Sequence, residues 1–97
     1  MKSVFIVYNQ AHTERVEFML EKLGIRGFTM WQDVMGCGSE TGDPRMGSHA
    51  WSEMNSAILS IVPSEKVEVL LSSVKKLDAI NAEVGIRAFV WNVEQMV

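Results

Sequence analysis

The chain has 97 residues, of which 47% are hydrophobic and 22% charged, and its formal net charge at pH 7 is −3. This length supports a single domain over residues 1–97, and the apolar fraction excludes an intrinsically disordered chain. Because no basic tract offsets the acidic balance, nucleic acid is not expected as a partner.

The first half of the chain alternates strand and helix patterns. Residues 3–8 (SVFIVY) are β-branched and aromatic, which favours a central strand. Residues 10–23 carry apolar side chains at i, i+3, i+4 and i+7, which predicts a helix with Asn9 as its N-cap and Gly24 as its C′ residue. Alternating apolar side chains over residues 25–34 predict a second strand.

The second half repeats this order after a glycine-bearing loop. Residues 53–62 (EMNSAILSIV) predict a third strand, Ser64 is expected to cap a second helix, and residues 86–93 (IRAFVWNV) predict a fourth strand. The order β-α-β-β-α-β predicts an α+β, ferredoxin-like sandwich, with a four-stranded antiparallel sheet and both helices on one face. The other face would be bare unless subunits cover it, and the high apolar content favours an oligomer.

Three short motifs lie along the chain in an order known from one protein family. Residues 24–30 read GIRGFTM, residues 34–42 read VMGCGSETG, and residues 85–94 read GIRAFVWNVE. They resemble three patterns of the nitrogen-regulatory P-II signalling proteins: G-I-x-G-[MF]-T-[VI], V-x-G-x-G-x-x-x-G and G-K-I-F-V-x-x-V-E. Arg87 stands where the last pattern has lysine. The chain is similar to a short-loop, divergent member of that family.

The resemblance implies a homotrimer with clefts between neighbouring subunits, in which family members hold ATP or ADP. Backbone N–H groups of Gly36, Cys37, Gly38 and Ser39 would line the cleft, and Arg87 would reach toward phosphate. The loop would dock on a regulated partner such as a membrane transporter. Its candidate contact residues are Glu40, Thr41, Gly42, Asp43, Arg45, Met46 and His49.

Departures from the family pattern leave the ligand open. Residues 39–42 (SETG) replace the family's R-Q-K-G, so basic and amide groups are missing, and the loop has no tyrosine to accept a uridylyl group. The three glycines of the loop could instead form only a bulge and a turn. Arg87 could equally be a solvated charge or half of an inter-subunit ion pair.

A metal-sensing or metal-tolerance trimer, similar in role to CutA proteins, is the alternative function. Cys37, Met46 and His49, with Met35 nearby, offer thiolate, thioether and imidazole groups that suit copper or zinc, although their spacing matches no compact metal motif. No acid–base pair or nucleophile–histidine arrangement is recognisable, so we do not expect an enzyme.

The sequence also indicates where the protein resides in the cell and where its tryptophans lie in the fold. The apolar run at the N-terminus is too short for a signal sequence, and no run reaches membrane-spanning length. With a single cysteine, this favours a cytoplasmic protein without direct membrane insertion. Trp31, Trp51 and Trp91 are expected to pack on a sheet face or trimer interface rather than to stack on a ligand.

Overall fold

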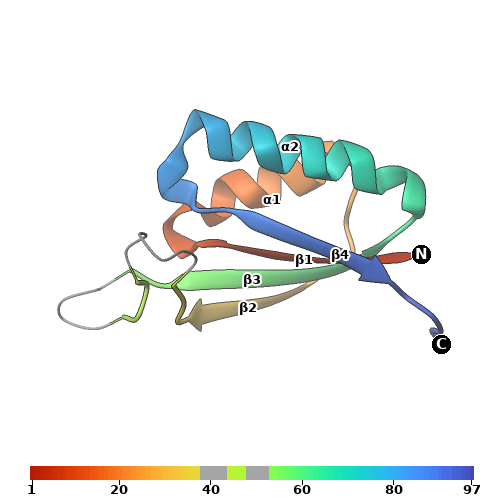
Figure 1. Ribbon diagram of the computed structural model, residues 1–97, viewed down its shortest axis with the longest axis horizontal. Helices are drawn as coiled ribbons and strands as arrows, with labels where there is room; N and C mark the ends of the chain where they lie inside the picture. Colours follow the sequence, from red (N-terminus) through yellow and green to blue (C-terminus); the bar gives the residue numbers. More distant parts are fainter. Residues whose placement is uncertain (38–43, 48–52) are drawn as a thin grey trace.

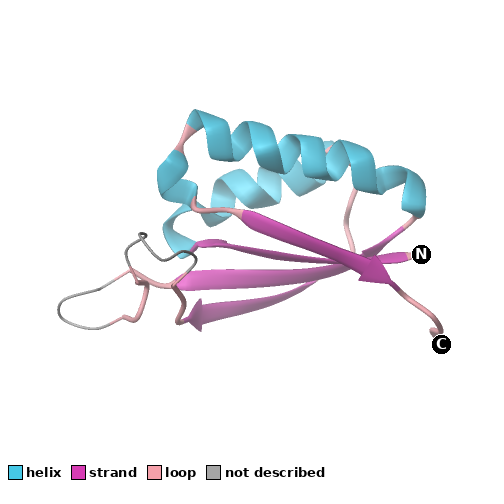
Figure 2. Ribbon diagram, in the orientation of Figure 1, coloured by secondary structure: helices cyan, strands magenta, loops and turns pink. Residues whose placement is uncertain are grey.

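The computed structural model describes residues 1–37, 44–47 and 53–97, which form one antiparallel sheet with two helices on one face (Figures 1 and 2). The sheet has the strand order β2-β3-β1-β4. This confirms the ferredoxin-like arrangement predicted from the sequence. The elements are β1 (Lys2–Asn9), α1 (Thr13–Lys22), β2 (Thr29–Val34), β3 (Asn55–Val62), α2 (Val67–Ile80) and β4 (Arg87–Asn92), with short 3-10 turns η1 (Gln10–His12), η2 (Ser64–Lys66) and η3 (Ala82–Val84).

The core lies between the sheet and the helices. Val4, Ile6 and Tyr8 of β1 are fully buried, because alternate residues of the central strand point toward the helices. Burying an aliphatic side chain of this size contributes about 1.5–3 kcal/mol each. The core consists of Val4, Ile6, Tyr8, Val16, Met19, Leu20, Ile25, Ile58, Val62, Leu70, Val74, Val84 and Ile86.

The predicted C-terminal end of the first helix is confirmed, whereas Asn9 caps the 3-10 turn before α1, whose own N-cap position is His12. The Asn9 side chain accepts a hydrogen bond from the backbone N–H of Ala11 at 3.1 Å, so it caps the η1 turn that leads into α1. At the other end Gly24 has φ of 71°. Its backbone N–H donates to the Glu21 carbonyl, and the Ile25 N–H donates to the Leu20 carbonyl. This is a Schellman termination, which requires a left-handed residue.

Two details of the predicted elements are wrong. Ser64 is the first residue of η2 rather than a cap, and no side chain caps that turn. The second strand begins at Thr29 rather than at residue 25, because Ile25 completes the helix termination and is buried in the core.

A β-bulge interrupts the expected alternation in β2. Trp31 pairs with Ala57 and Val34 with Asn55, so two residues of β2, Gln32 and Asp33, lie opposite one residue of β3. Asp33 adopts φ of 57°, the left-handed region that aspartate tolerates better than most residues. As a result Trp31 and Val34 fall on the same face of the sheet, where strict alternation would have separated them.

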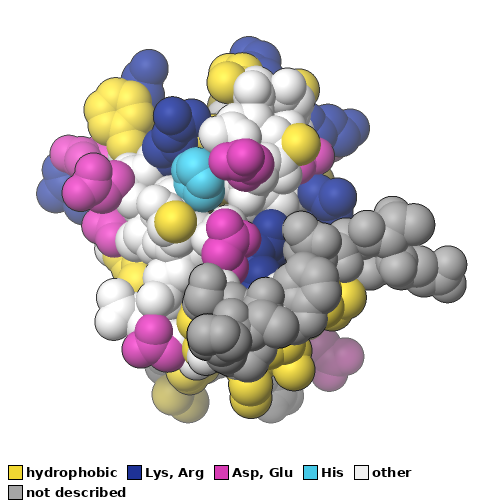
Figure 3. Space-filling view, turned by 90° about the vertical axis from the view of Figure 1, so that its left-hand side faces the viewer, with side chains coloured by type: hydrophobic (Ala, Val, Ile, Leu, Met, Phe, Trp, Pro, Cys, Tyr) yellow, Lys and Arg dark blue, Asp and Glu magenta, His cyan; other side chains and the backbone are white. Residues whose placement is uncertain are grey.

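The sheet face opposite the helices, here called the open face, is largely apolar. Phe5 lies between Leu59 of β3 and Phe89 of β4, and Trp91 and Ile61 flank Ser3. Phe89 is 56% exposed and Trp91 50%. Figure 3 shows hydrophobic side chains along the lower side of the molecule, where this face lies. Trp31 and Trp91 thus occupy a sheet face as expected, and Trp51 lies outside the described residues.

None of the helices in the described parts of the chain is long and apolar enough to cross a membrane.

Candidate ligand site at the base of the loop

The loop after β2 is closed at its base by a pair of backbone hydrogen bonds. The Gly36 N–H donates to the Arg45 carbonyl at 2.8 Å, and the Arg45 N–H donates back to the Gly36 carbonyl at 2.5 Å. A Cβ at Gly36 would collide with the side-chain amide of Asn55. A larger residue at position 36 would therefore displace the Asn55 amide, which accepts the hydrogen bond from Arg45.

The Arg45 side chain is folded inward at this base, with only 16% of its surface exposed. Its Nη1 donates to Asn55 Oδ1 at 3.1 Å, and its Nε lies 3.8 Å from Glu53 Oε2. Among the described residues Nε has no hydrogen-bond partner. The guanidinium is thus bonded to Asn55 and ion-paired with Glu53, and its Nε is a donor without a hydrogen bond among the described residues.

The turn before β4 meets the same guanidinium. Gly85 has φ of 56°, and a Cβ there would collide with the Arg45 side chain. The η3 turn just before it is capped by Asn81, whose Oδ1 accepts from the Glu83 N–H at 3.0 Å. Arg45 therefore joins the loop base to the connection before the last strand, two segments about 40 residues apart in the chain.

A second polar cluster fixes the end of β2. Gln10 donates through Nε2 to Asp33 Oδ1 at 2.8 Å, and its Oε1 accepts from the Asp33 N–H at 2.6 Å and from Ser56 Oγ at 2.9 Å. Asn9 adds bonds to Glu53 and to the Glu83 carbonyl, both at 3.2 Å. The side chains at the end of β1 thereby hold β2, β3 and the η3 turn in one register.

The predicted ligand residues divide into three cases. Gly36 lies at the closed base, and Cys37 follows it and is exposed. Gly38 and Ser39 lie outside the described residues. Arg87 is ion-paired to α2, with Nη1 3.2 Å from Asp78 Oδ1, and also donates to the Ile86 carbonyl. The cation in contact with the loop base is therefore Arg45.

The predicted partner contacts divide similarly. Met46 is 44% exposed, as a docking residue should be, whereas the inward position of Arg45 favours an internal role for its side chain. Glu40, Thr41, Gly42, Asp43 and His49 lie outside the described residues. Within the described ranges, no group of three or more His, Cys, Asp or Glu side chains could hold a metal ion.

Sequence reasoning missed the connecting role of Arg45. One signal was available, because Arg45 is the only lysine or arginine between Met35 and Glu53. The long side chain of a single arginine in a glycine-rich loop can reach a neighbouring turn. A glycine in that turn, such as Gly85, has no Cβ to block the guanidinium. Only the pairing of β1 with both β3 and β4 brings these segments together.

Comparison with known proteins agrees with this architecture. Two solved structures of CPII, a nitrogen regulatory PII-like protein from Thiomonas intermedia K12, match 95% of this chain. The structure bound to ADP and bicarbonate has a TM-score of 0.76 and 24% sequence identity, and the match covers 84% of its chain. The structure bound to ADP, AMP and bicarbonate has a TM-score of 0.73 and 23% sequence identity, and the match covers 88% of its chain. These TM-scores establish a shared fold.

A candidate PII-like signaling protein from Thermus thermophilus also matches, with a TM-score of 0.68 and 25% identity over 95% of this chain and 85% of its own. No functionally curated protein matches the sequence. The family model described as nitrogen regulatory protein P-II covers residues 1–97 in full. The chain therefore belongs to the nitrogen regulatory P-II family and is a PII-like regulatory protein.

Proposed function

We propose that this protein is a trimeric signal transducer in which an adenine nucleotide at the loop base changes the arrangement of the loop and thereby controls a partner, such as a membrane transporter. The observation that carries the proposal is the position of Arg45 between the loop base and the turn before β4. A ligand at this junction contacts the root of the loop directly. Its effect requires that it bind one loop arrangement more tightly than another.

The chemistry of the junction suits a phosphate group. Gly36 allows close approach of backbone, and its bridge partner Arg45 carries a guanidinium whose Nε is ion-paired with Glu53 but makes no hydrogen bond among the described residues. Arg87 adds a second cation, since its side chain is 55% exposed and can exchange Asp78 for a phosphate. Structures of the Thiomonas protein hold ADP with AMP and bicarbonate or with bicarbonate alone, which supports adenine nucleotides as first candidates and bicarbonate as a second.

The open face supports the trimer. Phe89, Trp91 and Trp31 are half exposed in the single chain, an arrangement typical of surfaces that associate. All four strands contribute residues to this face. If neighbouring subunits packed against it, they would be held in a fixed position relative to the sheet and therefore to the loop base at its end. The predicted cleft between subunits would then border the junction that Arg45 holds.

Isothermal titration calorimetry with ATP, ADP and bicarbonate, each alone and in pairs, tests the proposal. We expect micromolar nucleotide binding at about one site per subunit, weakened about tenfold in Arg45→Ala and in Arg87→Ala, since each removes a charge-assisted hydrogen bond. Arg26→Ala, an exposed arginine elsewhere on the chain, is the matched control and should bind like the parent. Absence of binding heat with every ligand would refute the nucleotide mechanism.

Metal binding is a second candidate, favoured by one observation. In the antiparallel bridge between Gly36 and Arg45, the flanking Met35 and Met46 lie across from each other, and Cys37 is adjacent. Met35 is 61% exposed and Met46 44%. Two thioethers and a thiol suit Cu(I). If the Cys37→Ser, His49→Ala double variant bound Cu(I) and zinc as tightly as the parent, this candidate would be abandoned.

A further inference from the structure

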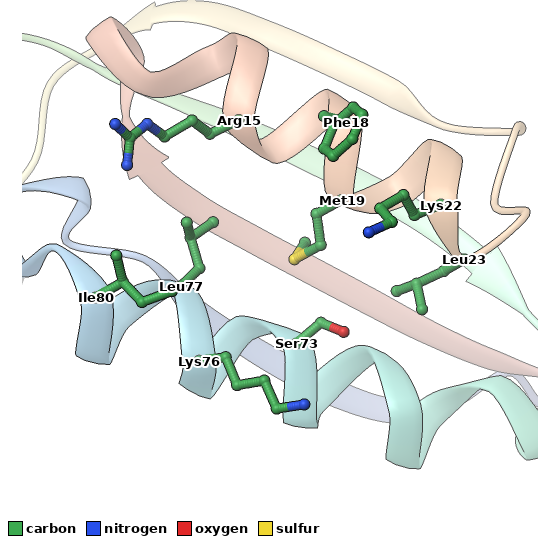
Figure 4. A pocket seen from close by; sticks show the side chains of 9 residues that line it. All are labelled: Arg15, Phe18, Met19, Lys22, Leu23, Ser73, Lys76, Leu77 and Ile80. Atoms are coloured by element: carbon green, nitrogen blue, oxygen red, sulfur yellow. The ribbon is translucent and has the colours of Figure 1, made fainter.

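A shallow groove runs between the two helices on the surface that faces away from the sheet. It has a volume of about 590 Å³. Met19 and Leu77 point into it from opposite helices, and Leu23 closes one end (Figure 4). Two apolar side chains along it are unusually open to solvent, Phe18 at 61% and Ile80 at 76%. A helix pair that served only to cover the sheet would not need apolar side chains there.

The charges around the groove have one sign. Arg15, Lys22 and Lys76 line it, and no carboxylate does among the residues the structure describes. The Lys22 ammonium lies 5.5 Å from the centroid of the Phe18 ring, which keeps that cation at the rim. The whole chain has twelve acidic and nine basic residues, so three cations at one groove run against the overall balance.

The acidic residues of the first helix are on another side. By helical periodicity Glu14, Glu17 and Glu21 project away from the line of Arg15 and Lys22. Asp78 of α2 pairs with Arg87 at the edge of the sheet. The groove is therefore an apolar strip with a cationic rim, bordered on the outside by carboxylates.

We propose that this groove binds an acidic amphipathic helix of a partner protein. A helix laid along the groove would set apolar side chains on Met19, Leu77 and Ile80 and place carboxylates near the three cations. The groove is open to solvent, whereas small-molecule sites enclose most of their ligand. An anionic membrane is a poorer fit, because the glutamates of α1 share the outer surface and would be repelled.

The groove is lined by residues of α1 and α2 and by Leu23 just after α1, and both helices lie on the side of the sheet opposite the open face (Figure 1). A partner there would leave both the proposed trimer interface and the loop base accessible. The proposal therefore stands independently of the proposed nucleotide function, and failure of either would not imply failure of the other.

Fluorescence anisotropy with synthetic peptides tests the proposal. The probe is a labelled helical peptide of about 18 residues, or five turns, with leucines at i, i+3, i+4 and i+7 and glutamates elsewhere. A peptide of identical composition in scrambled order and one with lysines in place of glutamates are its controls. We expect saturable binding of the amphipathic acidic peptide alone.

The matched variants are Lys76→Glu, in the groove, and Lys75→Glu, the neighbouring exposed lysine that lines a different surface of α2. Lys76→Glu should weaken binding about fivefold or more and Lys75→Glu less than twofold, because only the first places a like charge beside the peptide. Ile80→Ser should weaken it as well. Equal effects of the two lysine variants, equal binding of the scrambled peptide, or binding of anionic phosphatidylserine vesicles with none of the acidic peptide would each overturn the proposal.

Discussion

The two faces of the sheet are built by the same strands but differ in solvent exposure: the face toward the helices is buried, and the open face is partly exposed. In β3, Ile58 faces the helices and is fully buried, whereas Ile61, three residues on, lies on the open face and is 39% exposed. In β1 the same alternation separates Ile6 from Phe5. One face thus holds the core of the single chain, and the other leaves apolar side chains exposed, as the proposed trimer interface requires. The difference shows that alternate positions of a single strand can serve two purposes: one set stabilises the fold of the subunit, and the other is available for contacts between subunits.

The largest effect should come from shortening the same side chain on the two faces. Ile58→Ala should lower the free energy of unfolding by about 3 kcal/mol, because it removes buried methylene groups and leaves a cavity. Ile61→Ala should lower the free energy of unfolding by less than about 1 kcal/mol under conditions where the protein is monomeric, since that side chain is already partly exposed to solvent. Urea unfolding at low protein concentration measures both. Equal losses would mean that the open face is already covered in the isolated subunit.

The next prediction addresses the open face directly. Phe89→Glu should leave the subunit folded but weaken self-association by about 30-fold or more, because it places a charge where an apolar interface is expected. Ile80→Glu, at an even more exposed apolar position on the helix side, is the control and should not change the mass in solution. Sedimentation equilibrium distinguishes the two. A trimer that survives Phe89→Glu would assign the interface to another surface.

The smallest effect concerns the junction where the loop base meets the sheet. Gly85→Ala should destabilise the protein by about 1–2 kcal/mol, because alanine is strained at φ of 56° and its Cβ would displace Arg45. Gly27→Ala is the control, since a Cβ there meets no atom within 4 Å. Thermal unfolding measures both. In an Arg45→Ala background the cost of Gly85→Ala should shrink, and an unchanged cost would show that the guanidinium does not press on this turn.

Much of the fold could be predicted because its signals are local. The period of apolar residues identified both helices, and the Asn9 cap and the Gly24 termination lie within a few residues of the helix they bound. The second strand was harder. Ile25 is apolar whether it enters a strand or ends a helix, and the bulge at Gln32 and Asp33 depends on β3, which lies more than twenty residues away.

The sequence by itself determined the order of elements, the apolar character of the open face and the family resemblance, because each depends on residue type and spacing along one strand or helix. Tertiary structure alone decided which cation meets which segment. Arg87, expected near phosphate, pairs with Asp78 of α2, while Arg45, expected to face a partner, lies against Gly85. A long side chain can reach several neighbours, and only the packing of distant segments selects one of them.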